Sequence, residues 1–182
     1  YTRFVNVLTG YVPRINVFSS TPTPPSQRHL TIAYRGRPLP ARYGKLGQEK
    51  VGIGKLVKHY CDSKGITHDI SWAEEDRIYG DRWYEFMSSS KAMLGSESGS
   101  NVFDWDGLLA TKIKDYKVSC PNASDDEIYK KLIQPLEEDG LMNQVSPRIF
   151  EAIAAHTVLV LFEGEYSGVV TPGIHFILLK KD

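Results

Sequence analysis

Residues 146–162 read Ser146-Pro147-Arg148-Ile149-Phe150-Glu151-Ala152-Ile153-Ala154-Ala155-His156-Thr157-Val158-Leu159-Val160-Leu161-Phe162. Serine followed by proline is a favoured order at a helix start, with the serine as N-cap and the proline in the first helical position. A helix is therefore predicted through Ala154. The continuous apolar run from Thr157 to Phe162 is typical of a strand that is buried on both faces of a parallel sheet. Together these two patterns predict one helix–strand unit of an α/β protein.

The same alternation of strands and helices runs through the rest of the chain. Apolar and β-branched runs predict strands, and apolar residues at helical spacing predict helices. The predicted strands are 30–34, 67–72, 92–95 and 173–179, and the predicted helices are 48–64, 82–90 and 124–136. We therefore predict an α/β fold: a Rossmann-like parallel sheet with helices on both faces. Such a sheet binds its ligand beyond the carboxyl ends of the strands, where the strand order reverses.

The composition of the 182 residues is that of one ordinary globular domain. The 22 basic and 22 acidic side chains cancel, so a protein that coats nucleic acid or an anionic membrane surface is not expected. No apolar run approaches the ~20 residues that a transmembrane helix needs. The two cysteines, Cys61 and Cys120, are too few for a disulfide framework. We interpret them as reduced thiols and expect a cytoplasmic location.

The domain organisation predicted from the sequence has two parts. Residues 1–27 are interpreted as an amino-terminal extension or linker, because three prolines fall within 22–25 and exclude regular structure there. Residues 28–182 form the α/β domain, with an insertion at about 100–140. The chain opens at Tyr1 and closes directly after an apolar run, so we interpret it as a domain from a longer protein.

Basic residues gather in the loop after the first predicted strand. Arg35, Arg37, Arg42 and Lys45 lie within eleven residues, with two glycines among them. Arginine forks match phosphate oxygens, and glycines let the backbone approach, so this loop suits a diphosphate. On spacing alone, a solvated basic loop is the simpler interpretation. Neither a dinucleotide-binding fingerprint nor a P-loop is present.

The turn after the third predicted strand is rich in small polar residues. Ser96, Glu97, Ser98 and Ser100 offer hydroxyls, a carboxylate and backbone amides that can hold a phosphate or a sugar hydroxyl. The same residues also suit a plain turn. No metal site is expected, because the histidines are scattered and the Asp104–Asp106 pair lacks the further ligands of a calcium loop.

Glu151 is the most informative acidic residue. It lies in the first turns of a helix whose amino end is expected to face the point where the strand order reverses. Its neighbours Phe150, Ile153 and Ala154 indicate a packed face, where a carboxylate is costly without partners. The vicinal hydroxyls of a ribose are natural partners for it.

With these residues in view, the chain resembles the donor-binding half of the group 1, retaining glycosyltransferases of the GT-B fold. That family carries an E-x7-E pattern whose second glutamate precedes an alanine-rich helix and a buried strand, and residues 151–161 are similar to this second half. Residues 163–170 take the place of the family's glycine-rich turn, and 173–179 that of its last strand. Upstream, 91–99 is similar to its serine turn and 34–50 to its basic diphosphate loop. The resemblance covers residues 28–182.

The resemblance implies a function and a set of binding residues. The chain would be a glycosyltransferase domain that binds a nucleoside-diphosphate sugar and is inactive alone, because the acceptor domain of the same protein is missing. No metal or other cofactor is implied, and the catalytic residues stay unassigned. The implied donor-binding residues are Arg35, Arg37, Lys45, Glu97, Ser98, Asn143, Ser146, Arg148 and Glu151.

The sequence departs from the family pattern at two places. The first glutamate of E-x7-E is Asn143 here, and Glu97 from the neighbouring loop is a candidate substitute. The insertion at about 100–140 lies where the family has few residues. Two alternatives stay open: a nucleotide-sugar epimerase-like half-domain, or a non-catalytic α/β interaction module. A donor site requires Glu151 to face the same crevice as the arginine loop, whereas an interaction module does not.

Overall fold

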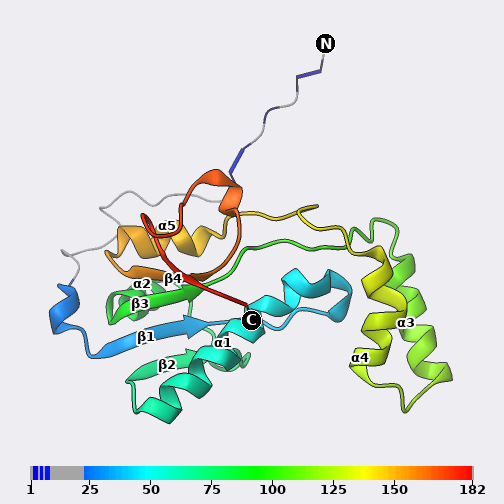
Figure 1. Ribbon diagram of the computed structural model, residues 1–182, viewed down its shortest axis with the longest axis horizontal. Helices are drawn as coiled ribbons and strands as arrows, with labels where there is room; N and C mark the ends of the chain where they lie inside the picture. The colour runs from blue at the N-terminus through cyan, green and yellow to red at the C-terminus, as the bar shows by residue number, and fades with distance from the viewer. Residues whose placement is uncertain (1, 4, 6, 9–22, 182) are drawn as a thin grey trace.

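The computed structural model of the chain describes residues 2–3, 5, 7–8 and 23–181. Within these residues a parallel sheet of five strands lies at the centre of the molecule, in the spatial order β2-β1-β3-β4-β5 (Figure 1). The strands are β1 (Leu30–Arg35), β2 (His68–Ser71), β3 (Ser90–Gly95), β4 (Val158–Phe162) and β5 (Ile177–Leu179). The strand order reverses between β1 and β3, so the loops that leave these two strands diverge there.

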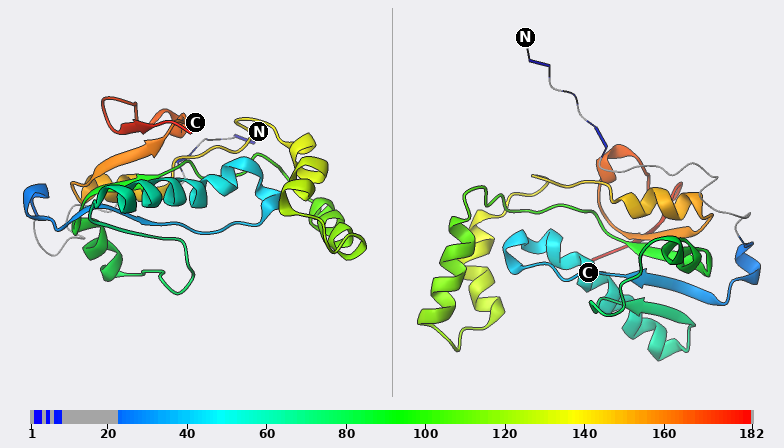
Figure 2. Two further views of the ribbon diagram at one scale, coloured as in Figure 1. Left: turned by 60° about the horizontal axis from the view of Figure 1, so that its bottom comes forward. Right: turned by 180° about the vertical axis from the view of Figure 1, so that it is seen from behind.

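Helices cover both faces of the sheet (Figure 2). Helix α1 (Gly44–Lys64) lies on one face, and α2 (Asp81–Ser88) and α5 (Pro147–Ala154) lie on the other. Alternate residues of β1 belong to the two hydrophobic cores on opposite faces of the sheet. Ile32 and Tyr34 pack toward α1, and Ala33 packs toward α2 and α5. Burial of apolar side chains on both faces is the main source of stability in such a sheet.

The predicted α/β Rossmann-like class is thus confirmed, although several element boundaries differ. Helix α1 begins at Gly44 rather than 48, and the last strand begins at 177 rather than 173 because Gly173 takes a positive φ of 76° in a turn. The helix predicted over 124–136 consists of α4 (Asp125–Ile128), a π-helical turn (Tyr129–Ile133) and a 3-10 turn (Gln134–Leu136). Helix α3 (Leu108–Ser119) lies in the segment predicted as an insertion, for which no helix was predicted before residue 124.

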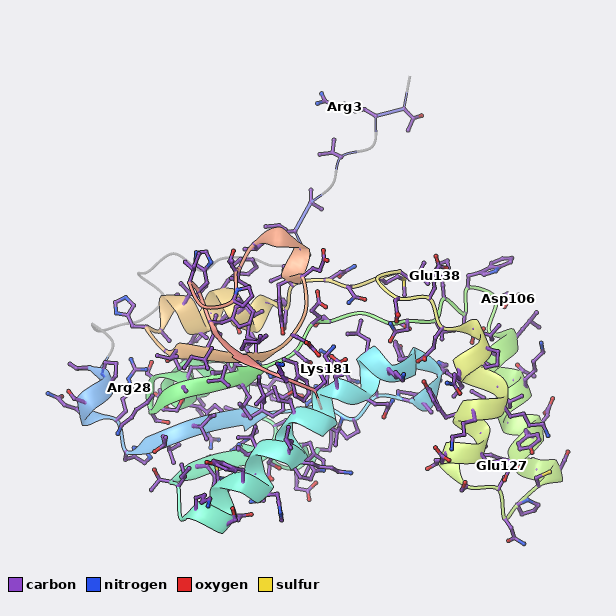
Figure 3. All side chains as sticks on the ribbon, viewed as in Figure 1. Arg3, Arg28, Asp106, Glu127, Glu138 and Lys181 are labelled. Atoms are coloured by element: carbon purple, nitrogen blue, oxygen red, sulfur yellow. The ribbon has the colours of Figure 1, made fainter. Side chains whose placement is uncertain are left out.

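Helix α3 and the helical segment 125–136, which begins with α4, form a helical hairpin at one end of the molecule (Figure 1). The hairpin packs around a small core of its own, built from Val102, Leu109, Ile128 and Ile133. Figure 3 shows Glu127 at its far end, and Asp106 and Glu138 at the end where the connecting segments reach it. This hairpin occupies the segment predicted as an insertion.

The hairpin also holds the amino end of α1. The Glu137 carboxylate accepts a hydrogen bond from the Lys45 amide (2.5 Å), and the Asn101 side-chain oxygen accepts one from the Leu46 amide (2.6 Å). The first helical amides have no partner within a helix, so such caps stabilise it. Gly44 permits this start, because φ is +73° there and a Cβ would lie 2.6 Å from the Glu137 carboxylate.

Arg28 anchors the chain at the opposite, amino-terminal edge of the sheet (Figure 3). Arg28 is 4% exposed, and its guanidinium donates to the Ser90 and Ala155 carbonyls and the Thr157 hydroxyl at 2.7–2.8 Å. The residues just before it form a 3-10 turn, Pro25–Gln27, and much of the predicted extension over 1–27 lies outside the described residues. Among the described residues, no helix has the length and apolar character to cross a membrane.

Candidate functional site

Two cavities lie where the strand order reverses, and both reach the carboxyl end of β1. The first, here called the basic cavity, has a volume of about 550 Å³ and is lined by the end of β1, the end of β3, Lys50 of α1 and the first turn of α5. The second, here called the aromatic cavity, has a volume of about 370 Å³ and is lined by Tyr79, Trp83, Tyr84 and Glu151. Four arginines line both cavities: Arg35, Arg37, Arg77 and Arg148.

Lys50 and Arg148 supply positive charge inside the basic cavity. The Lys50 ammonium group donates to the Ser98 hydroxyl at 3.0 Å, and the Arg148 guanidinium lies over the Tyr34 ring at 4.8 Å. Burial, together with the positive charge of Arg148, lowers the pKa of Lys50 to about 8. None of the described residues that line this cavity is acidic. Two neighbouring cations without a carboxylate between them favour a multiply charged anion.

Arg35 is engaged within the protein. Its guanidinium forms a two-pronged ion pair with the Asp69 carboxylate, at 2.8 Å for both hydrogen bonds, and donates to the Asp76 carbonyl at 2.9 Å. It also lies 4.4 Å from the centre of the Phe86 ring. Arg35 therefore ties β1 to β2 and to the loop after β2, and Asp69 offsets much of its charge.

Arg77 is also paired with a carboxylate, whereas Arg37 is not paired with one in the described part of the chain. Arg77 pairs with the exposed Glu74 carboxylate at 2.6 Å, whereas Arg37 is an exposed side chain that lines both cavities. Arg37 makes no salt bridge to any residue that the structure describes. Its charge is therefore available to a ligand.

Glu151 faces the same crevice as the arginine loop. It lines the aromatic cavity together with Arg35 and Arg37, and one carboxylate oxygen, Oε2, accepts a hydrogen bond from Trp83 Nε1 at 2.9 Å. Glu151 and the arginine loop thus line one cavity. The Trp83 ring also lies 5.3 Å from the Arg148 guanidinium, so this one side chain contacts both the carboxylate and the cation.

Ser146 and Ser98 lie beside the basic cavity. Ser146 lines it at the amino end of α5, where its side chain makes no capping hydrogen bond to the described residues. Ser98 holds Lys50 through its hydroxyl, and its backbone pairs with Gln144. Both serines therefore support the cation-lined surface, Ser146 at the cavity wall and Ser98 behind Lys50.

The remaining predicted residues gather in a third cavity, of about 900 Å³. It is lined by Lys45, Glu97 and Asn143, along with other polar residues. Glu97 is 3% exposed, and its carboxylate accepts hydrogen bonds from the Tyr166 amide and the Asn143 side-chain amide, both at 2.7 Å. Glu97 and Asn143 are thus direct neighbours, and Glu97 holds the turn after β4. The predicted donor-binding residues therefore lie partly at the adjoining basic and aromatic cavities and partly at this third cavity.

No family model, curated protein or solved structure matches this chain. Among the described residues, no group of three or more histidine, cysteine, aspartate or glutamate side chains is placed to hold a metal ion. The geometry of the crevice is therefore the basis for the functional proposal.

Sequence reasoning missed three residues of the crevice. Lys50 follows Leu46 by four residues and precedes Ile53 by three, so it interrupts the buried stripe of α1; a lysine in such a stripe is a signal that could have found it. Arg77 lies in a loop without a distinctive pattern. Trp83 has no signal of its own, because its partner Glu151 lies 68 residues further along the chain.

Proposed function

We propose that this chain is the nucleotide-sugar-binding domain of a glycosyltransferase with the GT-B fold. The donor, a nucleoside-diphosphate sugar, binds across the basic and aromatic cavities. The observation that supports this most directly is that available cations and Glu151 line adjoining cavities at the reversal of strand order. An anion with a hydroxyl-bearing group beside it satisfies both sets of residues.

In this proposal the diphosphate lies in the basic cavity. Lys50 and Arg148 contact its oxygens, Arg37 closes on it from the loop after β1, and the amino end of α5 adds the Ser146 hydroxyl. The amino end of a helix favours a bound anion because it is the positive end of the helix dipole. The nucleoside lies in the aromatic cavity, with its ribose at Glu151 and its base against the aromatic side chains.

The same cations serve the transfer step. The bond between the anomeric carbon and the diphosphate oxygen breaks with its electron pair on the oxygen. The oxygen of an acceptor hydroxyl bonds to the anomeric carbon and loses its proton to solvent, and the departing diphosphate gains negative charge. Lys50 and Arg148 stabilise that charge as it develops. The acceptor site belongs to another domain, so we expect this chain alone to bind the donor and to transfer nothing.

The proposal is tested by thermal unfolding against a panel of nucleoside diphosphates and nucleotide sugars, with and without magnesium. Ligand at about 100 times its Kd stabilises the folded state by about 2.7 kcal/mol, which for a domain of this size raises Tm by roughly 5–10 °C. We expect one base to give this shift independently of magnesium. Arg148→Met removes it, whereas Arg82→Met, at an exposed position of α2, retains it. A wild-type protein that responds to no member of the panel contradicts the proposal.

A further inference from the structure

Trp83 joins the two halves of the crevice. Its indole N–H donates to Glu151 Oε2 at 2.9 Å, and the face of its ring lies 5.3 Å from the Arg148 guanidinium. The carboxylate comes from α5 and the indole from α2, so this contact also crosses between two helices on the same face of the sheet.

The position of the Trp83 ring is itself well defined. It stacks on Phe86 at 5.7 Å between ring centres, with 27° between the ring planes, and it packs against the core beneath α2 and α5. Phe86 in turn lies beneath Arg35, which is fixed by its ion pair with Asp69. Trp83 therefore presents its N–H to Glu151 from a rigid support.

This contact orients the Glu151 carboxylate and leaves its Oε1 open to a ligand. Oε2 is occupied by Trp83, and Oε1 accepts no hydrogen bond from the residues that the structure describes. A carboxylate that is free to rotate must be ordered when it binds a hydroxyl, and that ordering reduces affinity. A carboxylate already held on one oxygen avoids most of this loss.

We infer that Trp83 is a positioning residue, which holds Glu151 so that the aromatic cavity recognises the hydroxyls of a ribonucleoside. The inference rests on the proposed function and deepens it, since it names the part of the ligand that Trp83 controls. A ligand made only of phosphate does not reach Glu151 and is insensitive to this contact. A nucleoside diphosphate uses both cavities and depends on it.

The test measures binding by isothermal titration with UDP, ADP and GDP, with their 2′-deoxy counterparts, and with inorganic pyrophosphate. In Trp83→Phe, which keeps an aromatic ring but loses the N–H donor, we expect affinity for the bound ribonucleotide to fall about tenfold. Pyrophosphate affinity stays within twofold, and the preference for the ribonucleotide over its 2′-deoxy form shrinks. Trp105→Phe, at a 78% exposed position on the hairpin side of the molecule, changes none of these values.

Two further variants separate positioning from a loss of packing. Benzothienylalanine at position 83 has the shape of tryptophan but a sulfur in place of the N–H, so it folds like the wild type and should reproduce the selective loss. In a Glu151→Ala background, Trp83→Phe should weaken ribonucleotide binding by less than a further twofold. Equal losses for pyrophosphate and ribonucleotide, or an unchanged ribonucleotide affinity, overturn the inference alone. Absence of nucleotide binding by the wild-type protein overturns the proposed function as well.

Discussion

Replacement of Lys50 by methionine should make the unliganded protein more stable while it weakens anion binding. The folded environment lowers the pKa of Lys50 from 10.5 to about 8, mainly through burial and then through Arg148. Each pKa unit corresponds to about 1.36 kcal/mol, so the charged ammonium destabilises the fold by about 3 kcal/mol at neutral pH. Methionine removes this cost.

The lost hydrogen bond to Ser98 offsets part of the gain, by about 1 kcal/mol. A net stabilisation of about 2 kcal/mol remains, which raises Tm by roughly 4–8 °C for a domain of this size. In the same variant, loss of a charge-assisted contact should weaken pyrophosphate binding at least tenfold. Such opposite effects on stability and binding are typical of functional sites.

The pH dependence gives this prediction a sign that can be checked. Between pH 8 and 10.5 the unfolded state binds more protons at Lys50 than the folded state, so wild-type stability rises with pH relative to Lys50→Met. The stability advantage of Lys50→Met is therefore largest well below pH 8 and shrinks as the pH rises through 8 toward 10.5.

Urea unfolding of the wild type and Lys50→Met at pH 7 and pH 10, together with pyrophosphate titration, measures all of these effects. Lys55→Met, at an exposed position of the same helix, is the matched control. If Lys50→Met is less stable than the wild type at pH 7, or if the gap between them does not change with pH, the account of Lys50 as a buried, unneutralised cation is refuted.

Three further predictions concern the crevice and the hairpin. Glu151→Ala should weaken nucleoside-diphosphate binding more than tenfold and leave pyrophosphate binding and the fold intact. Titration measures both affinities, and an unchanged nucleotide affinity would remove Glu151 from the site. Affinity for pyrophosphate should fall as sodium chloride rises from 50 to 500 mM, because Arg37 is exposed to screening, and a flat salt response counts against electrostatic binding. Glu137→Ala should lower the free energy of unfolding by about 2 kcal/mol, since the Lys45 amide and the Tyr129 hydroxyl both lose their acceptor. Urea unfolding checks this against Glu138→Ala, and equal stability of the two variants would contradict the capping role.

The fold was predictable because it depends on local patterns. A few adjacent residues are enough to predict the strand at Val158–Phe162 and the start of α5 at Ser146-Pro147. Alternation of such strands and helices along the chain then predicts a parallel sheet. The helical hairpin was harder to predict from the sequence. The buried side chains of α3 are few, with Leu109 alone fully buried, so its helical period is weak.

The site could be predicted only in part. Arg37, Arg148 and Glu151 were found because their sequence neighbours marked a loop or a helix start. Lys45 was predicted to lie with them because it follows β1 closely in the sequence. Since α1 already begins at Gly44, Lys45 lies on the helix and lines the third cavity, and Lys50 of the same helix lines the basic cavity. Contacts such as that of Trp83 with Glu151 depend on the packing of distant elements, which no local pattern contains.

The capping of α1 by the hairpin limits how far this domain can be reduced. Tyr43 stands in the N-cap position but contributes no side-chain hydrogen bond, so Asn101 and Glu137 supply the acceptors from elsewhere in the chain. Excision of residues 102–137 to obtain a minimal domain would expose the amide of Lys45 and loosen the helix that carries Lys50. A shortened protein would need a new acceptor at the junction, such as Tyr43→Asp, before its ligand binding could be compared with that of the whole chain.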